Sequence, residues 1–191
     1  DIMKSLAGEV SGDQQVMDVD SLVQAATDVE VESAKKLVAY YTSWSAYGRN
    51  YEVDEIPASK ITHLNYGFAN IKNGKIDLGD EWIDTQEGQV WHGEGSDAEF
   101  FGNFKRLNDL KVENPHLKTM ISIGGWTWST EFPSLASTSE GRNVFAQSVA
   151  NFVSMYGFDG ADIDWEFPTD DVNGHNFTLL MDAIDEHLEV Q

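Results

Sequence analysis

The chain has 191 residues, of which 33 are acidic and 12 are basic, and its formal net charge is -21. A surface of this charge repels phosphate backbones and anionic lipid headgroups, so neither nucleic acid nor a membrane surface is an expected partner. Hydrophobic residues make up 41% and aromatic residues 12%, which is typical of a folded core and not of disorder. Cysteine is absent, which excludes disulfide bonds and thiolate metal sites.

The first 36 residues differ in composition from the rest of the chain. They are acidic and contain no aromatic residue, whereas aromatic residues are frequent from Leu37 onward. This change predicts a boundary near Lys36. The run SLVQAATDVEVESAKK has apolar residues at roughly helical spacing, so a helix is one interpretation. The charge favours the other, an acidic linker or the tail of an upstream domain at 1–36.

Beyond the boundary, short apolar runs alternate with helical patterns. Buried strands are predicted at 37–44, 61–71, 118–125 and 158–167. Helices are predicted at 96–115, 137–157 and 176–188, and only a turn or two of helix near Pro57 to Lys60 joins the first two strands. In the second helix, Ser137 and Glu140 predict a capping box and Gly157 predicts the C-terminal end. This alternation indicates parallel βα units.

Parallel βα units form either an open doubly wound sheet or a closed barrel. No G-x-G-x-x-G follows the first strand, so the main sign of a dinucleotide-binding open sheet is missing. In the fourth run, FDGADIDWEFP, acidic residues alternate at 162, 164 and 166, which places their side chains on one face. A barrel would put that face in the lumen near the C-terminal mouth, where barrel active sites lie. We therefore predict an α/β fold, a (β/α)8 TIM barrel.

The alternating acids also indicate a chemistry. Three neighbouring carboxylates repel one another in low-dielectric surroundings, so at least one is expected to hold a proton near neutral pH. Glycoside hydrolysis needs such an acid to protonate a leaving oxygen. Glu166, the longest and the nearest to the strand's C-terminal end, is the best candidate. On spacing alone, a divalent-cation site and a purely structural network remain alternatives.

Three stretches resemble a known family. The run from Asp159 to Glu166 matches the signature D-G-x-D-x-D-W-E of the family 18 glycoside hydrolases, the chitinases and their relatives. SIGGW, residues 122–126, resembles the S-x-G-G motif of that family, and residues 40–71 resemble the first two strands of its bacterial chitinases. The resemblance implies that residues 37–191 are the N-terminal half of a TIM-barrel catalytic domain, with about the first four βα units.

The resemblance also implies roles for the residues of the motifs, in a mechanism without metal or cofactor. The 2-acetamido oxygen of the substrate attacks the anomeric carbon, while Glu166 protonates the glycosidic oxygen and later acts as base toward water. Asp164 would bind the acetamido N–H and stabilise the positive charge, and Asp162 would share a proton with Asp164. Ser122 and Tyr40 would donate hydrogen bonds to Asp162.

Aromatic residues and glycines near these motifs are candidate substrate contacts. Tyr40 and Phe68 resemble the walls of the cleavage subsite, and Trp126 resembles a sugar platform, because sugar rings stack on aromatic rings. Packing in the core is the alternative for each. Gly124 and Gly125 would let the backbone approach the sugar closely, or would simply form a turn at the strand end.

Other features set the limits of the expected function. Asp159 lies at the start of the fourth strand, away from the mouth, so its expected role is structural. The five histidines show no spacing typical of metal ligands. The chain stops at Gln191 inside an apparent helix, before any counterpart of the later barrel strands. We therefore expect a fragment, inactive alone, whose partner is the missing C-terminal half of the barrel.

The leading hypothesis is a chitinase that cuts β-1,4 linkages between N-acetylglucosamine units of chitin or its oligosaccharides. Secretion is implied by the family resemblance alone. An endo-β-N-acetylglucosaminidase acting on N-glycans and a non-catalytic chitin-binding lectin of the same fold are the alternatives. Glu166 argues against the lectin, because such proteins characteristically lose this acid. A metal-dependent hydrolase is a third alternative and would be sensitive to a chelator.

Overall fold

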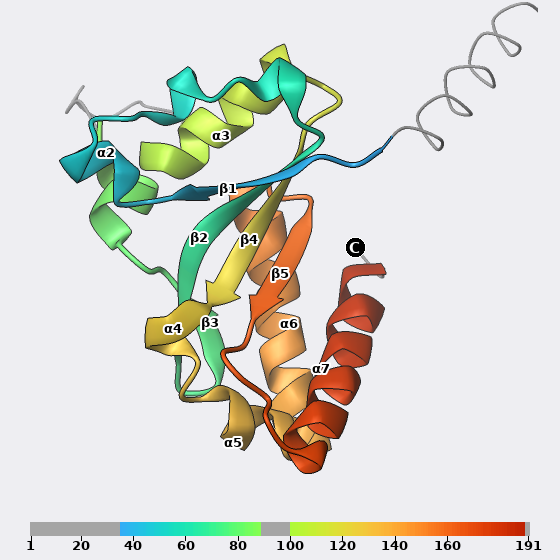
Figure 1. The fold of residues 1–191 in the computed structure, drawn as a ribbon. Coiled ribbons are helices and arrows are strands. Elements are labelled where there is room, and N and C mark those ends of the chain that lie inside the picture. The colour runs from blue at the N-terminus through green and yellow to red at the C-terminus, as the bar shows by residue number, and fades with distance from the viewer. Residues whose placement is uncertain (1–34, 89–99, 190–191) are drawn as a thin grey trace, which may run out of the picture. The chain divides into compact units, whose positions relative to one another are not determined.

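The computed structural model describes residues 35–88 and 100–189 (Figure 1). The interpretation of residues 1–34 as part of a linker or tail therefore lies outside the described residues. The centre of the described part is a parallel sheet in the order β1-β2-β4-β5, formed by Val38–Thr42, His63–Lys72, Lys118–Gly124 and Gly160–Asp164. Each strand lies beside the one that precedes it in the parallel series, with no reversal of order. This is the order of a barrel sheet, as predicted, and not that of a doubly wound sheet.

The four predicted strands are all present, but the fourth is shorter than predicted. β5 ends at Asp164, so Trp165 and Glu166 lie beyond the sheet. A further strand, β3 (Lys75–Asp77), was not predicted and pairs antiparallel with the end of β2. Lys72 and Lys75 are paired, so the hairpin loop is Asn73-Gly74, and both loop residues have positive φ. Asn-Gly is the preferred pair for such a two-residue hairpin, so the signal was present in the sequence.

The longer helices follow the strands as the sequence predicts. They are α3 (Gly102–Glu113), α6 (Ser139–Tyr156) and α7 (Asp171–Glu189). The shorter elements are α2 (Ser45–Gly48), η1 (Val53–Glu55), η2 (Ala58–Lys60), η3 (Trp82–Gln86), α4 (Gly125–Trp128) and α5 (Phe132–Ala136). Residues 96–99 of the first predicted helix lie outside the described part. None of the helices in the described ranges is both long enough and apolar enough to cross a membrane.

The start of α6 corrects one prediction. The N-cap is Thr138, whose Oγ1 accepts the Gly141 N–H at 3.0 Å. Ser137 is not the cap, because its backbone is helical at the end of α5 and its hydroxyl donates to the Ser134 carbonyl. Thr138 has the extended backbone that a cap requires. The predicted end of α6 is confirmed, since Gly157 adopts the left-handed conformation there.

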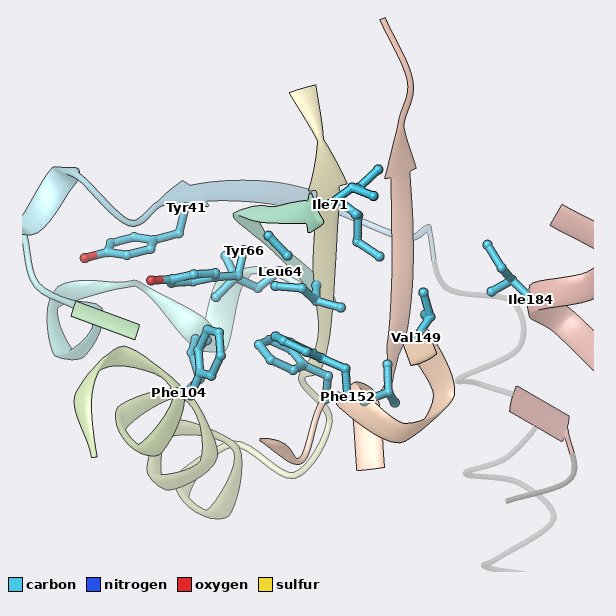
Figure 2. Packing of buried hydrophobic residues seen from close by; sticks show 14 of the residues in the cluster. Tyr41, Leu64, Tyr66, Ile71, Phe104, Val149, Phe152 and Ile184 are labelled. Atoms are coloured by element: carbon cyan, nitrogen blue, oxygen red, sulfur yellow. The ribbon is translucent and has the colours of Figure 1, made fainter. Parts of the chain in front are cut away.

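The core fills the space between the sheet and the helices. Tyr66 of β2 meets the edge of the Phe104 ring of α3, with centroids 5.3 Å apart, and Phe104 in turn contacts Phe152 of α6 (Figure 2). Beyond the end of β5, Trp165 is buried and stacks on Phe132 of α5 at 5.3 Å. The apolar side of the β5 segment therefore faces the helices, as predicted, which leaves its acidic side for the concave face of the sheet.

Candidate active site

Two strands of the sheet bring hydroxyl groups to one carboxylate on a third strand. Asp162 of β5 is in register with Ser122 of β4. The Ser122 hydroxyl donates to Asp162 Oδ2 at 2.7 Å, and the Tyr40 hydroxyl of β1 donates to the same oxygen at 2.8 Å. The pKa of Tyr40 is raised, mainly by burial, with Asp162 and Asp164 adding to the effect. Tyr40 therefore keeps its proton at neutral pH and remains a donor.

The contact between Tyr40 and Asp162 also shows that the sheet is curled. β1 and β5 are the two ends of the strand order, with β2 and β4 between them. Three strand spacings in a flat sheet amount to about 14 Å. A hydrogen bond between side chains of the two edge strands therefore requires a strongly concave sheet. The acidic side of β5 lies inside that curve, as it does in the lumen of a barrel.

Asp164 lies one step further toward the C-terminal end of β5, where its Cα is in register with Gly124. The pKa of Asp164 is raised by burial first and then by the charges of Glu166 and Asp162. The charges of Glu166 and Asp162 therefore disfavour the ionised form of Asp164. A raised pKa favours the protonated form of one member of the group.

Glu166 is the residue whose placement the sequence missed. It was expected on the strand, but β5 ends two residues earlier. Its amide instead donates to Ser129 Oγ at 2.9 Å. Ser129 follows α4, is only 6% exposed, and its hydroxyl lies 2.8 Å from the Gly125 carbonyl and 3.1 Å from the Asp164 carbonyl. Nothing in the local sequence marked Ser129, because its contacts to Asp164 and Glu166 join residues 35 and 37 positions apart.

Gly124, the last residue of β4, and Gly125, the first residue of α4, are needed for backbone geometry. Gly124 and Gly125 have φ values of 105° and 68°, which favour glycine. A Cβ at Gly124 would lie 2.6 Å from both the Asp164 carbonyl oxygen and the Phe132 ring, and one at Gly125 would lie 3.3 Å from the Phe68 ring. Both glycines thus allow the chain to turn at the end of β4, and their role in close approach to the sugar stays a prediction.

The candidate aromatic residues differ in exposure. Trp126 is 80% exposed and Tyr40 is 56% exposed, so packing in the core does not account for either. Phe68 is partly buried and stacks on Trp44, with ring centroids 6.2 Å apart. Trp44 is itself half exposed. These rings come from β1, β2 and the segments that follow β1 and β4.

Asp159 lies at the opposite end of β5. Its carboxylate accepts the Thr119 amide at 2.9 Å and forms ion pairs with Lys111 at 2.9 Å and Lys118 at 3.1 Å. Burial alone would raise the pKa of Asp159, but the amide and the two ammonium groups together outweigh it and lower the pKa. Asp159 is therefore separate from the cluster around Asp162.

No set of three or more His, Cys, Asp and Glu side chains within 35–88 and 100–189 has an arrangement that could hold a metal ion. The Asp162 carboxylate of β5 accepts two hydroxyl hydrogen bonds. His92 lies outside the described residues. The geometry described so far favours proton transfer by carboxyl groups at the C-terminal ends of parallel strands, which is the position of the active site in TIM-barrel enzymes.

Comparison with known proteins agrees with this class. The sequence model of the family described as "Glycosyl hydrolases family 18" matches residues 36–191. Chitinase A1 of Niallia circulans is 41% identical over 207 residues, which cover 87% of this chain and 29% of the relative. Endochitinase 1 of Metarhizium anisopliae is 46% identical over 154 residues, which cover 78% of this chain and 36% of the relative.

Solved structures give the same result. Chitinase ChiA74 from Bacillus thuringiensis superposes with a TM-score of 0.73 at 35% identity, over 82% of this chain and 33% of that one. A Group IV chitinase of Ostrinia furnacalis in complex with allosamidin gives a TM-score of 0.70 at 30% identity, over 82% and 41%. The chain belongs to glycosyl hydrolase family 18. It spans roughly a third of the length of the curated relatives named above, 29% and 36%.

Proposed function

We propose that this chain carries the catalytic carboxylates of a chitinase, which hydrolyses β-1,4 linkages between N-acetylglucosamine units with retention of configuration. The observation that carries the proposal is the group formed by Asp162, Asp164 and Glu166 on the concave side of a family 18 sheet. Asp162 accepts the hydroxyl groups of Tyr40 and Ser122, and the backbone amide of Glu166 donates to the Ser129 hydroxyl oxygen. The names of the relatives, chitinase and endochitinase, support the same activity.

In the proposed reaction the substrate supplies its own nucleophile. The acetamido N–H donates to Asp164, which orients the acetamido oxygen toward the anomeric carbon. That oxygen forms a bond to the carbon as the glycosidic C–O bond breaks and Glu166 gives its proton to the leaving oxygen. Water then attacks the anomeric carbon and returns a proton to Glu166. The product regains its acetamido group and keeps its original configuration.

The proposal gives Asp162 and Asp164 complementary tasks. Asp162 accepts two hydroxyl hydrogen bonds on one oxygen, so its position is fixed before substrate arrives. The raised pKa of Asp164 supports a proton shared within the group in the free enzyme. The positive charge that develops on the acetamido group would favour the ionised form of Asp164. In this proposal, the negative charge of the carboxylates is greatest in the transition state, where the positive charge on the acetamido group develops.

The exposed rings are the proposed contacts for the sugar chain. Trp126 and Tyr40 present aromatic surface near the strand ends, and Phe68 with Trp44 forms a stacked pair close by. The C–H faces of a neutral polysaccharide pack on such rings. A neutral polymer also avoids the repulsion that a chain of net charge -21 exerts on anions. Because solid chitin does not enter cells, the proposed site of action is outside the cell.

The test uses the protein purified in its native length. Chitotetraose should be cleaved and cellotetraose should not, because the 2-hydroxyl group of cellotetraose cannot replace the acetamido nucleophile. Glu166→Gln should lower the turnover of chitotetraose by about 100- to 10,000-fold while oligosaccharide binding persists, since the amide cannot supply a proton. Comparable rates on the two tetrasaccharides would overturn the substrate-assisted mechanism. Binding of chitotetraose without any cleavage by the unaltered protein would instead indicate the lectin.

We further propose that a polypeptide of these 191 residues alone is at most a weak binder. The described residues form four parallel strands, whereas a TIM barrel closes with eight. β1 and β5 lie at the ends of the described strand order, and open strand edges promote association. Size-exclusion chromatography and release of a chromophore from a chitobioside would test this. A monomer that turns over like the native-length protein would refute it.

A further inference from the structure

The backbone of Glu166 is not held by the sheet. β5 ends at Asp164, so the hydrogen bonds between strands stop two residues before the proposed acid. On the other side of Glu166, the Phe167 side chain is 61% exposed. The carboxyl group that must meet the glycosidic oxygen therefore lies on a segment that needs some other restraint.

Ser129 supplies that restraint through one oxygen atom. Its Oγ accepts the Glu166 amide at 2.9 Å. Its single hydroxyl hydrogen can go to the Gly125 carbonyl at 2.8 Å or the Asp164 carbonyl at 3.1 Å. The Ser129 side chain thus joins the start of α4, the last residue of β5 and the amide of Glu166. Since Ser129 is buried, water does not readily take over these bonds.

We propose that Ser129 is a positioning residue for the reaction, which fixes the Glu166 carboxyl group relative to Asp164. This inference rests on the proposed function of Glu166 as the acid. Ser129 has no proposed contact with substrate and acts only through the backbone of Glu166. Its hydrogen bond to the amide sets the point from which the Glu166 side chain extends toward the glycosidic oxygen.

The segment that contains Glu166 is also held by side-chain packing that does not involve Ser129. Trp165, between Asp164 and Glu166, is buried and is held by the rings of Phe132 and Phe177, with centroids 5.3 and 6.0 Å away. Those contacts remain when the Ser129 hydroxyl is removed. The expected result of Ser129→Ala is therefore a folded protein in which the Glu166 amide has lost its acceptor and the acid is less well placed.

The experiment compares Ser129→Ala with Ser137→Ala in the native-length protein. Ser137 is a matched control, because its hydroxyl also donates to a backbone carbonyl, that of Ser134, but touches neither β5 nor Glu166. Ser129→Ala should lower kcat for chitotetraose by about 10- to 100-fold with KM within about threefold, since a 1 Å misplacement can cost about 100-fold. Ser137→Ala should leave both constants unchanged.

A second measurement follows the amide directly. Hydrogen exchange resolved by residue should show the Glu166 amide protected in the unaltered protein, although it lies outside the sheet. In Ser129→Ala it should exchange at least about 10-fold faster, while the amides of β5 keep their protection. A Glu166 amide that exchanges as fast as that of Phe167 in the unaltered protein would overturn the inference, whatever the variant does.

The outcomes separate this inference from the proposed function. If Glu166→Gln is inactive and Ser129→Ala is fully active, the acid is correctly assigned and Ser129 does not position it. If both variants are fully active, the proposed function itself fails. A Ser129→Ala protein that does not fold would assign Ser129 to stability and overturn the positioning role.

Discussion

The two ends of β5 use the same type of residue for opposite purposes. At its start, Asp159 is surrounded by Lys111, Lys118 and the Thr119 amide, and its pKa is lowered. At its end, Asp164 faces Asp162 and Glu166, and its pKa is raised by burial and by these like charges. The two aspartates are five positions apart in one eight-residue run. The neighbours on adjacent elements, and not the run itself, decide which carboxylate stabilises the fold and which is suited to chemistry.

This division follows the general plan of parallel barrels. Residues at the N-terminal ends of the strands serve stability, and residues at the C-terminal ends serve catalysis. At the Asp159 end, Lys111 also donates to the Gly157 carbonyl at 2.6 Å, so α3, α6 and β5 meet around the ion pairs. At the Asp164 end, the hydrogen-bond donors to the cluster are neutral hydroxyl groups. In the proposed mechanism, the ionisation of that cluster can therefore change when substrate binds.

Among the tests of this comparison, exchanging each aspartate for asparagine should give the largest effect, at Asp164. Asp164→Asn should lower kcat by about 100- to 1,000-fold, because the negative charge proposed to stabilise the developing cation is lost. Asp159→Asn should leave kcat within about threefold, because its contacts lie at the other end of the strand. Steady-state kinetics on chitotetraose in the native-length protein would measure both. A large loss of kcat in Asp159→Asn, with the fold intact, would mean that the two ends are not independent.

A third carboxylate, that of Asp84, shows the effect of burial on a pKa. Asp84 in η3 is buried and accepts the Tyr66 hydroxyl at 2.6 Å and the Asp80 amide at 3.0 Å. Burial raises the pKa of Asp84 to about 6, although the hydrogen bonds from Tyr66 and Asp80 oppose the shift. The folded protein therefore holds a proton at Asp84 between about pH 4 and pH 6 that the unfolded chain has released.

Stability should consequently fall as the pH rises through this window. A difference of about two pKa units corresponds to about 3 kcal/mol of unfolding free energy. Chemical denaturation of the unaltered protein and of Asp84→Asn at pH 4 and pH 7 would measure it. We expect the unaltered protein to lose about 2 kcal/mol relative to the variant between these pH values, because at pH 4 the unfolded carboxyl group is still partly protonated. Parallel pH profiles for the two proteins would show that Asp84 does not titrate there.

A smaller effect is expected at the ion pairs of Asp159. Asp159→Asn should lower the unfolding free energy at pH 7 by about 1–2 kcal/mol, because the carboxylate is partly exposed and solvent weakens its ion pairs. The lowered pKa gives the sign of the pH dependence. This stability is present above the ordinary pKa of an aspartate and disappears as the pH falls through the lowered value. A stability difference between the two proteins that persisted unchanged at pH 2 would contradict the charge-based explanation.

The sequence predicts the strands and helices well, because hydrophobic periodicity is a local property of the chain. The alternation of Asp162, Asp164 and Glu166 likewise indicates a shared face. The end of β5 could not be placed in the same way, since a strand ends where its neighbour's backbone stops pairing with it. The position of this strand end matters for Glu166. Because the strand ends before Glu166, the backbone of Glu166 is held by Ser129 and not by the sheet.

Hydrophobic periodicity does not reveal the contacts of the candidate site that join residues far apart in the sequence. The hydrogen bonds of Tyr40 and Ser122 to Asp162 join residues 122 and 40 positions apart. They were expected only because the motifs resemble those of a family. Ser129 belongs to no motif considered and was missed. The β3 hairpin is a different case, since Asn73-Gly74 was a usable local signal.

The smallest expected effect concerns the start of α6, the helix that leads through Gly157 to Asp159. Thr138 is the N-cap in the structure, whereas the sequence pointed to Ser137. Thr138→Ala should lower the unfolding free energy by about 1 kcal/mol, because it leaves the Gly141 amide without its acceptor. Ser137→Ala should cost less than about half of that, since its hydroxyl is exposed and donates to a single carbonyl. The hydroxyl hydrogen bonds of Thr138 and Ser137 go to Gly141 and Ser134 and to no residue of the proposed site, so kcat should be unchanged in each variant. Equal losses of stability in the two variants would restore Ser137 as a cap.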